Sequence, residues 1–125
     1  GKAAGVLLSV QCARFNTIEG NQFLRGGSAL LYVAGERNVI RRNQFDNGWG
    51  VNGTEKLGGH GVILTHSPNR SCSNSVGGNN LFEGNQIRNA WKRSDGTWAK
   101  ALEVEGEGQV VRQNYIFEAA EGVVG

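Results

Sequence analysis

Polar and apolar positions recur along the chain in a unit of eight residues. The first copy, NTIEGNQF, covers residues 16–23, and the others are NVIRRNQF, NLFEGNQI and QVVRQNYI, beginning at Asn38, Asn80 and Gln109. The sixth position of every copy is an asparagine, at intervals of 22, 42 and 29 residues: Asn21, Asn43, Asn85 and Asn114. A repeat with a period of about 20 residues or more predicts a solenoid, and the shortest interval gives a basic turn of 22 residues.

Two further columns of the repeat are apolar. One lies three places before the asparagine (Ile18, Ile40, Phe82, Val111) and the other two places after it (Phe23, Phe45, Ile87, Ile116). Such short segments with one apolar face predict strands rather than helices. A third strand is expected before each copy, at residues 6–10, 29–33, 61–65 and 101–104. Three short strands per turn, stacked in register, predict an all-β parallel β-helix.

The N-x-[IVF]-x-x-N-x-[FI] copies resemble the repeats of right-handed parallel β-helices in the pectate-lyase-like superfamily. The resemblance runs from about Val6 to Val124 and implies one right-handed domain over residues 1–125, with about four to five coils. It also implies an extracellular, periplasmic or cell-surface location. One scaffold hosts many functions, so the resemblance is more specific for fold than for activity.

Two columns are expected to be structural. Asparagine tolerates the left-handed conformation and can bond to the next asparagine in a stack, so the asparagine column predicts a ladder at a corner. The column two places before it alternates in charge: Glu19, Arg41, Glu83 and Arg112. Neighbouring coils lie roughly 4.8 Å apart, so this column predicts an outward ladder of ion pairs.

The inserts between copies fall around one strand of the coil. They cover residues 49–60 and 67–79, which flank the strand at 61–65, and residues 91–100, which precede the strand at 101–104. Inserts on one face of a solenoid commonly mark the binding face. We therefore expect a groove along the first strand of each coil.

Candidate site residues follow from alternation along that strand. With Leu8, Leu31, Leu64 and Leu102 inward, the outward column is Ser9, Tyr32, Thr65 and Glu103. The candidate catalytic residues are Glu103, Glu105, His66, Lys100 and Tyr32, and the candidate ligand contacts are Trp98, Thr65, His60 and Arg93.

Glu103 and Glu105 are expected on one face, about 7 Å apart. Such a pair suits acid/base glycoside chemistry or Ca²⁺ binding, whereas outward glutamates on a strand are also ordinary solvated surface. Trp98 is either a ring that contacts a sugar or an anchor at a loop base.

The segment Glu103-Val-Glu105 resembles the Glu-x-Glu calcium motif of the chondroitinase B and alginate lyase family. That resemblance implies Ca²⁺ bound by Glu103 and Glu105 against a uronic carboxylate. The lysine expected shortly after the motif is missing, since Gly106-Glu107-Gly108 follows, and the chain ends before the family's arginine.

Composition narrows the remaining classes. A net charge of +2 and the lack of a Lys/Arg run argue against nucleic acid, and the lack of a long apolar stretch argues against a membrane span. Cys12 and Cys72 are expected two coils apart, roughly 10 Å, which favours free thiols over a bridge. No capping helix is predicted at either end, so we expect self-association through the coil ends or contact with the rest of a longer β-helix.

Two hypotheses remain from the sequence. The first is a carbohydrate-active module that binds or processes a polysaccharide, as a lyase, hydrolase or epimerase if it is an enzyme. The second is a non-catalytic structural, adhesive or self-assembling β-helix of the surface-protein or phage-spike type.

Overall fold

The computed structural model describes residues 6–24, 29–47, 60–65, 78–90, 99–119 and 121–125. These residues form strands and turns and contain no helix. The strands are β1 (Val6–Arg14), β2 (Thr17–Glu19), β3 (Gln22–Leu24), β4 (Ala29–Glu36), β5 (Val39–Arg41), β6 (Gln44–Asp46), β7 (His60–Thr65), β8 (Leu81–Glu83), β9 (Gln86–Ala90), β10 (Lys100–Val104), β11 (Val110–Arg112), β12 (Tyr115–Ala119) and β13 (Glu121–Val124).

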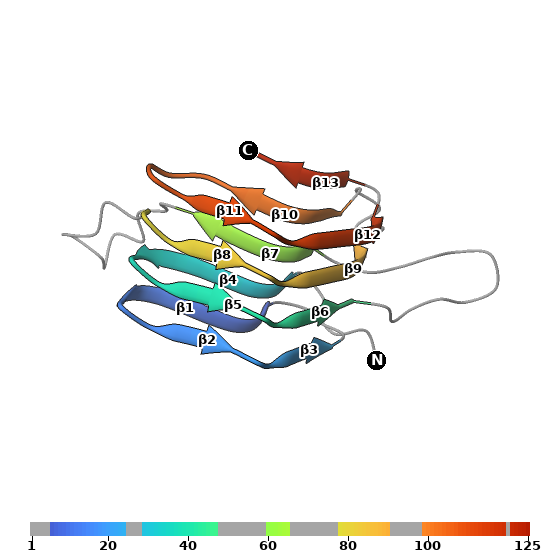
Figure 1. The fold of residues 1–125 in the computed structure, drawn as a ribbon, viewed down its shortest axis with the longest axis horizontal. Coiled ribbons are helices and arrows are strands. Elements are labelled where there is room, and N and C mark those ends of the chain that lie inside the picture. The colour runs from blue at the N-terminus through green and yellow to red at the C-terminus, as the bar shows by residue number, and fades with distance from the viewer. Residues whose placement is uncertain (1–5, 25–28, 48–59, 66–77, 91–98, 120) are drawn as a thin grey trace.

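The strands form three parallel sheets, and each full coil contributes one strand to each sheet (Figure 1). Sheet A has the order β1-β4-β7-β10-β13, sheet B the order β2-β5-β8-β11, and sheet C the order β3-β6-β9-β12. In Figure 1 the chain runs from left to right along β2 and β3 at the front, returns behind them through β4, and climbs toward the C-terminus. The chain is therefore a right-handed parallel β-helix of about four coils, as the repeat predicts, and β13 lies in a fifth.

Sheets B and C have the register that the octapeptide predicts. In sheet B, Ile18 pairs with Ile40, Ile40 with Phe82, and Phe82 with Val111. The corresponding central column of sheet C is Phe23, Phe45, Ile87 and Ile116. The octapeptide carries no inserted residue in any copy, so its columns stay aligned through every coil.

Sheet A departs from the expected register at one strand. Leu31 pairs with Val62 and Val62 with Leu102, so Val62 occupies the place predicted for Leu64. Thr65 pairs with Ala34, two residues beyond Tyr32. The prediction of Thr65 in a column with Tyr32 and Glu103 is therefore wrong, and Ile63 holds that position.

A β-bulge adjusts the first coil. Ser9 pairs with Tyr32, 23 positions later, whereas Arg14 pairs with Glu36, 22 positions later, so β1 accommodates one extra residue between Gln11 and Arg14. Cys12 lies in this bulge with a φ of 56°. Cys12 is disulfide-bonded, which corrects the expectation of a free thiol, and the sequence holds one other cysteine, Cys72, outside the described residues.

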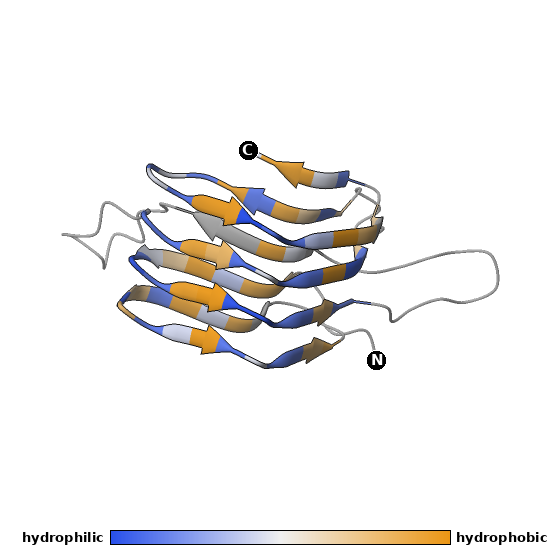
Figure 2. Ribbon diagram, viewed as in Figure 1, coloured by the Kyte–Doolittle hydropathy of each residue, from blue (hydrophilic) through white to orange (hydrophobic). Residues whose placement is uncertain are grey.

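The interior is a continuous column of apolar side chains between the sheets. The rings of Phe23 and Phe45 stack with centroids 4.8 Å apart, and those of Phe45 and Phe82 lie 6.0 Å apart. Leu31, Val62 and Leu102 cover the same core from sheet A. Figure 2 shows apolar residues along the strands and polar residues at the turns between them.

The turn between sheets B and C contains the predicted asparagine ladder. Asn43 Oδ1 accepts hydrogen bonds from the backbone N of Asn21 at 2.9 Å and from its Nδ2 at 3.3 Å. In the same way, Asn85 Oδ1 accepts from the backbone N and the Nδ2 of Asn43, and Asn114 Oδ1 accepts from the same two groups of Asn85. Each ladder amide also donates to a backbone carbonyl, as Asn43 does to Ile18 O at 2.9 Å.

The left-handed residue at this turn is the one before the asparagine. Gly20, Arg42, Gly84 and Gln113 have φ between 54° and 70°, whereas the asparagines themselves are not among the positive-φ residues. The expectation that asparagine supplies the left-handed conformation is therefore wrong. The asparagine amide instead forms hydrogen bonds to a neighbouring coil, and these bonds fix the orientation of the side chain.

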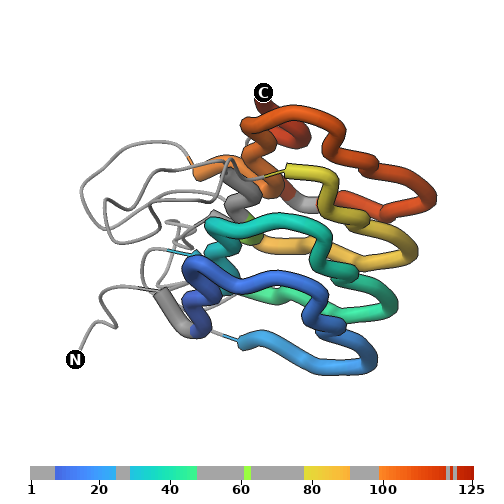
Figure 3. Tube along the Cα trace, turned by 90° about the vertical axis from the view of Figure 1, so that its left-hand side faces the viewer, coloured from blue at the N-terminus to red at the C-terminus, as the bar shows by residue number. Residues whose placement is uncertain are grey.

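A second ladder lies at the turn between sheets A and B. It consists of Asn16, Asn38, Asn80 and Gln109, with Asn38 Oδ1 accepting from Asn16 N at 3.0 Å and Asn80 Oδ1 accepting from Asn38 N at 2.9 Å. The residues before these four have positive φ as well. The two turns of each coil therefore share one arrangement, in which a residue with positive φ precedes an amide side chain that bonds to a neighbouring coil. Figure 3 shows the coils with parallel outlines.

The outer face of sheet B carries the predicted ion-pair ladder. Arg41 Nε lies 3.0 Å from Glu19 Oε1, and Arg112 Nε lies 3.2 Å from Glu83 Oε1. Arg42 also approaches Glu19, at 3.5 Å. The pairs of this column link the first coil to the second and the third coil to the fourth, and their charges remain in contact with water.

Candidate functional site

The predicted binding face lies on sheet A, where the outward column is Ser9, Tyr32, Ile63, Glu103 and Val124. Tyr32 and Glu103 are half-buried. On β4 the flanking residues of the same side, Leu30 and Ala34, are buried. The accessible part of β4 on this face is therefore narrow and centres on Tyr32.

Glu103 is held by an ion pair. The Nζ of Lys100 lies 3.2 Å from Glu103 Oε1, and both side chains are partly exposed. The structure thus brings together two of the predicted site residues, at the start and near the end of β10. Glu103 lies in the same outward column as Tyr32, with Ile63 of β7 between them.

Glu105 lies beyond the end of β10 and is exposed. Its carbonyl oxygen accepts a hydrogen bond from Gln109 Nε2 at 2.9 Å, so its backbone belongs to the turn that leads into sheet B. Glu103 and Glu105 therefore differ in setting, one within a strand and ion-paired, the other in a turn.

The other predicted site residues border the inserts. His60 begins β7 with its Cα paired to Ala29, and Thr65 ends β7 paired to Ala34; their side chains are outside the described parts. His66, Trp98 and Arg93 lie wholly outside the described residues, as do most of the three predicted inserts.

Ca²⁺ takes six to eight oxygen ligands, and the described residues do not supply such a set. Within them, no group of three or more His, Cys, Asp or Glu side chains comes together in a way that could hold a metal ion. Glu103 is also occupied by the ammonium of Lys100.

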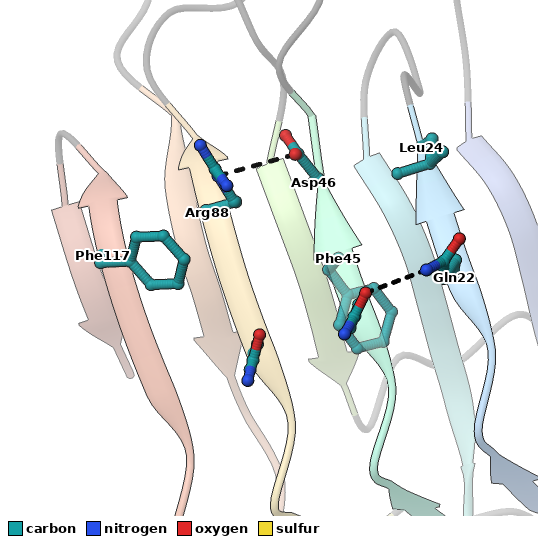
Figure 4. Close-up of a pocket in the computed structure, with 8 residues that line it drawn as sticks. Gln22, Leu24, Phe45, Asp46, Arg88 and Phe117 are labelled. Atoms are coloured by element: carbon teal, nitrogen blue, oxygen red, sulfur yellow. Dashed lines mark hydrogen bonds and ion pairs between the residues drawn. The ribbon is translucent and has the colours of Figure 1, made fainter.

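A second candidate site lies on the outer face of sheet C. There a hollow of about 410 Å³ is lined by Gln22, Leu24, Gln44, Phe45, Asp46, Gln86, Arg88 and Phe117 (Figure 4). Gln22 Nε2 donates to Gln44 Oε1 at 3.1 Å. Gln86 continues that column in register, and Tyr115 ends it.

The adjacent column of this face contains Leu24, Asp46, Arg88 and Phe117. Arg88 Nε lies 3.6 Å from Asp46 Oδ2, and Asn89 Nδ2 donates to Asp46 Oδ1 at 2.7 Å. The guanidinium of Arg88 lies over the Phe117 ring, 5.2 Å from its centroid, and the Tyr115 ring lies 4.9 Å from that of Phe117. Amides, a neutralised ion pair and two rings therefore share one open surface.

Sequence reasoning missed this face, although part of its signal is visible. The position after each asparagine reads Gln, Gln, Gln and Tyr, which marks an outward column of long polar side chains. The third position after each asparagine reads Leu, Asp, Arg and Phe, and so gives no repeating pattern to recognise. Only the register of sheet C brings the second column beside the first.

Comparison with protein-family models, with curated proteins and with solved structures finds no match to this chain. The class that the fold defines is the parallel β-helix, and its site must be interpreted from its own residues. The part of the chain that the structure describes includes no helix long and apolar enough to cross a membrane.

Proposed function

We propose that this chain is a carbohydrate-binding β-helix module of the pectate-lyase-like type, which holds a polysaccharide along the outer face of sheet A. The observation that carries the proposal is the partly exposed Lys100–Glu103 ion pair, whose glutamate lies in the outward column of sheet A that also contains Tyr32. Sugar hydroxyls can accept from the ammonium and donate to the carboxylate, and charged partners strengthen such hydrogen bonds.

The sequence positions of the inserts support the same face. They adjoin β7 on both sides and precede β10, so the chain is longest where it enters or leaves sheet A. Binding rather than catalysis is proposed, because Glu103 is paired with a lysine and Glu105 lies in a turn outside the strand.

A disulfide at Cys12 supports a location in an oxidising compartment, which the resemblance to surface and secreted β-helices also implies. Extracellular polysaccharides are encountered in such compartments. This argument concerns where the chain functions and does not depend on which polymer it binds.

The test is calorimetric titration of the chain with alginate, polygalacturonate and chondroitin, each with Ca²⁺ and with a chelator. We expect heat of binding with at least one polymer under both conditions, and about tenfold weaker binding in Glu103→Gln, because a hydrogen bond to a charged group is lost. Glu83→Gln is a matched control: the Glu83 side chain is 27% exposed and that of Glu103 24%, and each has its ion-pair partner at 3.2 Å. Equal losses of affinity in Glu103→Gln and Glu83→Gln, or no heat of binding with any polymer, would exclude this site.

The second candidate function is a structural, self-associating β-helix, and the ladders favour it. The backbone N–H groups of Asn21, Asn43 and Asn85 each donate to the asparagine of the coil that follows in the sequence, so the stack has a direction. A second copy, or further coils of a longer protein, can continue such a stack at a sheet edge. Light scattering over a range of concentrations separates the two functions, since a monomer at all concentrations is incompatible with association between copies.

A further inference from the structure

The outer face of sheet C presents a second binding surface, separate from the Lys100–Glu103 pair on sheet A. Its first column, which we call the amide column, is Gln22, Gln44, Gln86 and Tyr115. Strands in a sheet are spaced by roughly 4.8 Å, so the column repeats a hydrogen-bonding group at that interval along the solenoid axis. Each glutamine amide offers both donors and an acceptor.

The charges of the described residues that line the hollow on this surface cancel. Asp46 and Arg88 are neighbours across β6 and β9, with Nε and Oδ2 3.6 Å apart, and Asn89 adds a hydrogen bond to the carboxylate. The other residues that line the hollow are uncharged. A surface of this kind does not select an acidic or a basic polymer, since it has no net charge to complement one.

The aromatic end of the surface is arranged for stacking. Tyr115 is 64% exposed, and its ring lies 4.9 Å from that of Phe117. The guanidinium of Arg88 occupies a position over the Phe117 ring, which leaves Tyr115 as the more accessible of the two rings. Exposed tyrosine combines an apolar ring face with a polar hydroxyl, and it suits a ligand that is apolar on one side and polar at its edge.

We propose that the outer face of sheet C binds a neutral polysaccharide that runs across the strands, along the amide column. A sugar ring packs on Tyr115, and hydroxyls of the preceding sugars exchange hydrogen bonds with Gln86 and Gln44. The inference uses a different face and different residues, so it does not rest on the proposed function.

The test is native affinity electrophoresis of the full chain in gels that contain galactomannan, xyloglucan, laminarin or, for comparison, polygalacturonate. We expect at least one of the three neutral polymers to retard the chain. Retardation should not change when salt is added, because screening acts on charges and the surface carries no net charge.

Two variants localise the binding. Tyr115→Ala removes the ring, and we expect the affinity to fall about fivefold or more, in line with an aromatic contact of about 1 kcal/mol. The double variant Gln44→Ala/Gln86→Ala removes the amides, and we expect a loss at least as large. Circular dichroism checks that both variants keep the β-helix.

The controls are Phe15→Ala and Glu103→Gln. Phe15 is an exposed aromatic residue, 75% exposed, at the turn between sheets A and B, and Glu103 belongs to sheet A. Neither change should alter retardation by a neutral polymer. The proposal is overturned if no neutral polymer retards the chain, if retardation occurs with polygalacturonate alone, or if Phe15→Ala weakens binding as much as Tyr115→Ala does.

Discussion

The asparagine ladder between sheets B and C and the Glu/Arg ladder of sheet B are equally regular, yet they differ in solvent exposure. Both have one member in each of the four full coils, and both follow the 22, 42 and 29 residue intervals of the repeat. Asn43 and Asn85 are each 1% exposed. The side chains of Arg41 and Glu19 are 43% and 36% exposed.

This difference decides how much each column contributes to stability. The Asn43 amide makes hydrogen bonds to Asn21, Ile18 and Asn85, and water cannot replace them at a buried position. Water readily solvates the ions of the other ladder, so exposed pairs contribute little. A residue type that recurs in every coil therefore marks a register position, but its recurrence does not show how much that position contributes to stability.

The largest effect is expected at the buried ladder. Asn43→Ala should lower the free energy of unfolding by about 3 kcal/mol, because it removes several hydrogen bonds and leaves buried backbone groups without partners. Urea denaturation followed by circular dichroism measures the change. Asn21→Ala, at the exposed end of the same ladder, should cost about 1 kcal/mol. Similar losses at the two positions would show that burial does not set the difference between the ladders.

A change beside the ladder should have an intermediate effect. Gly84 has a φ of 66°, and a Cβ there would have open space apart from Arg42 Cγ at 3.8 Å. Gly84→Ala should therefore cost about 1 kcal/mol from backbone conformation alone. Gly122→Ala is the control, because Gly122 lies in β13 with nothing near its added Cβ and no positive φ. If thermal unfolding gives Gly84→Ala the same midpoint as Gly122→Ala, the turn does not depend on its left-handed residue.

The smallest effect is expected in the ion-pair ladder. Glu83→Gln should change the free energy of unfolding by less than about 0.5 kcal/mol, since Arg112 remains solvated without its partner. The small effect should shrink further in high salt, because salt screens exposed charges. If Glu83→Gln lowered the free energy of unfolding nearly as much as Asn43→Ala in the same urea experiment, the comparison between the two ladders would be contradicted.

The fold was largely predictable because the octapeptide contains two strands and a turn without insertions. Each copy fixes one strand of sheet B, one strand of sheet C and the asparagine between them. The alternation of Glu and Arg then confirms the register independently, as the Arg41–Glu19 and Arg112–Glu83 pairs show.

Sheet A was less predictable, because β7 lies between inserts and consists of successive apolar residues without an internal marker. The sequence GVILT allows Val62 or Leu64 to align with Leu31, and the structure selects Val62. The left-handed position was misassigned because Arg42 and Gln113 have no composition signal for positive φ. The sheet C surface was missed because Asp46, Arg88 and Phe117 differ from coil to coil, and only their register makes them neighbours.

The bulge in β1 shows how a coil can change length without disturbing its neighbours. One surplus residue is taken up between Gln11 and Arg14, so the pairing of Arg14 with Glu36 and of Asn16 with Asn38 returns to the common spacing. Single-residue insertions during evolution can therefore be absorbed within one strand of sheet A. Such tolerance allows a coil to change its length within sheet A while sheets B and C keep their period.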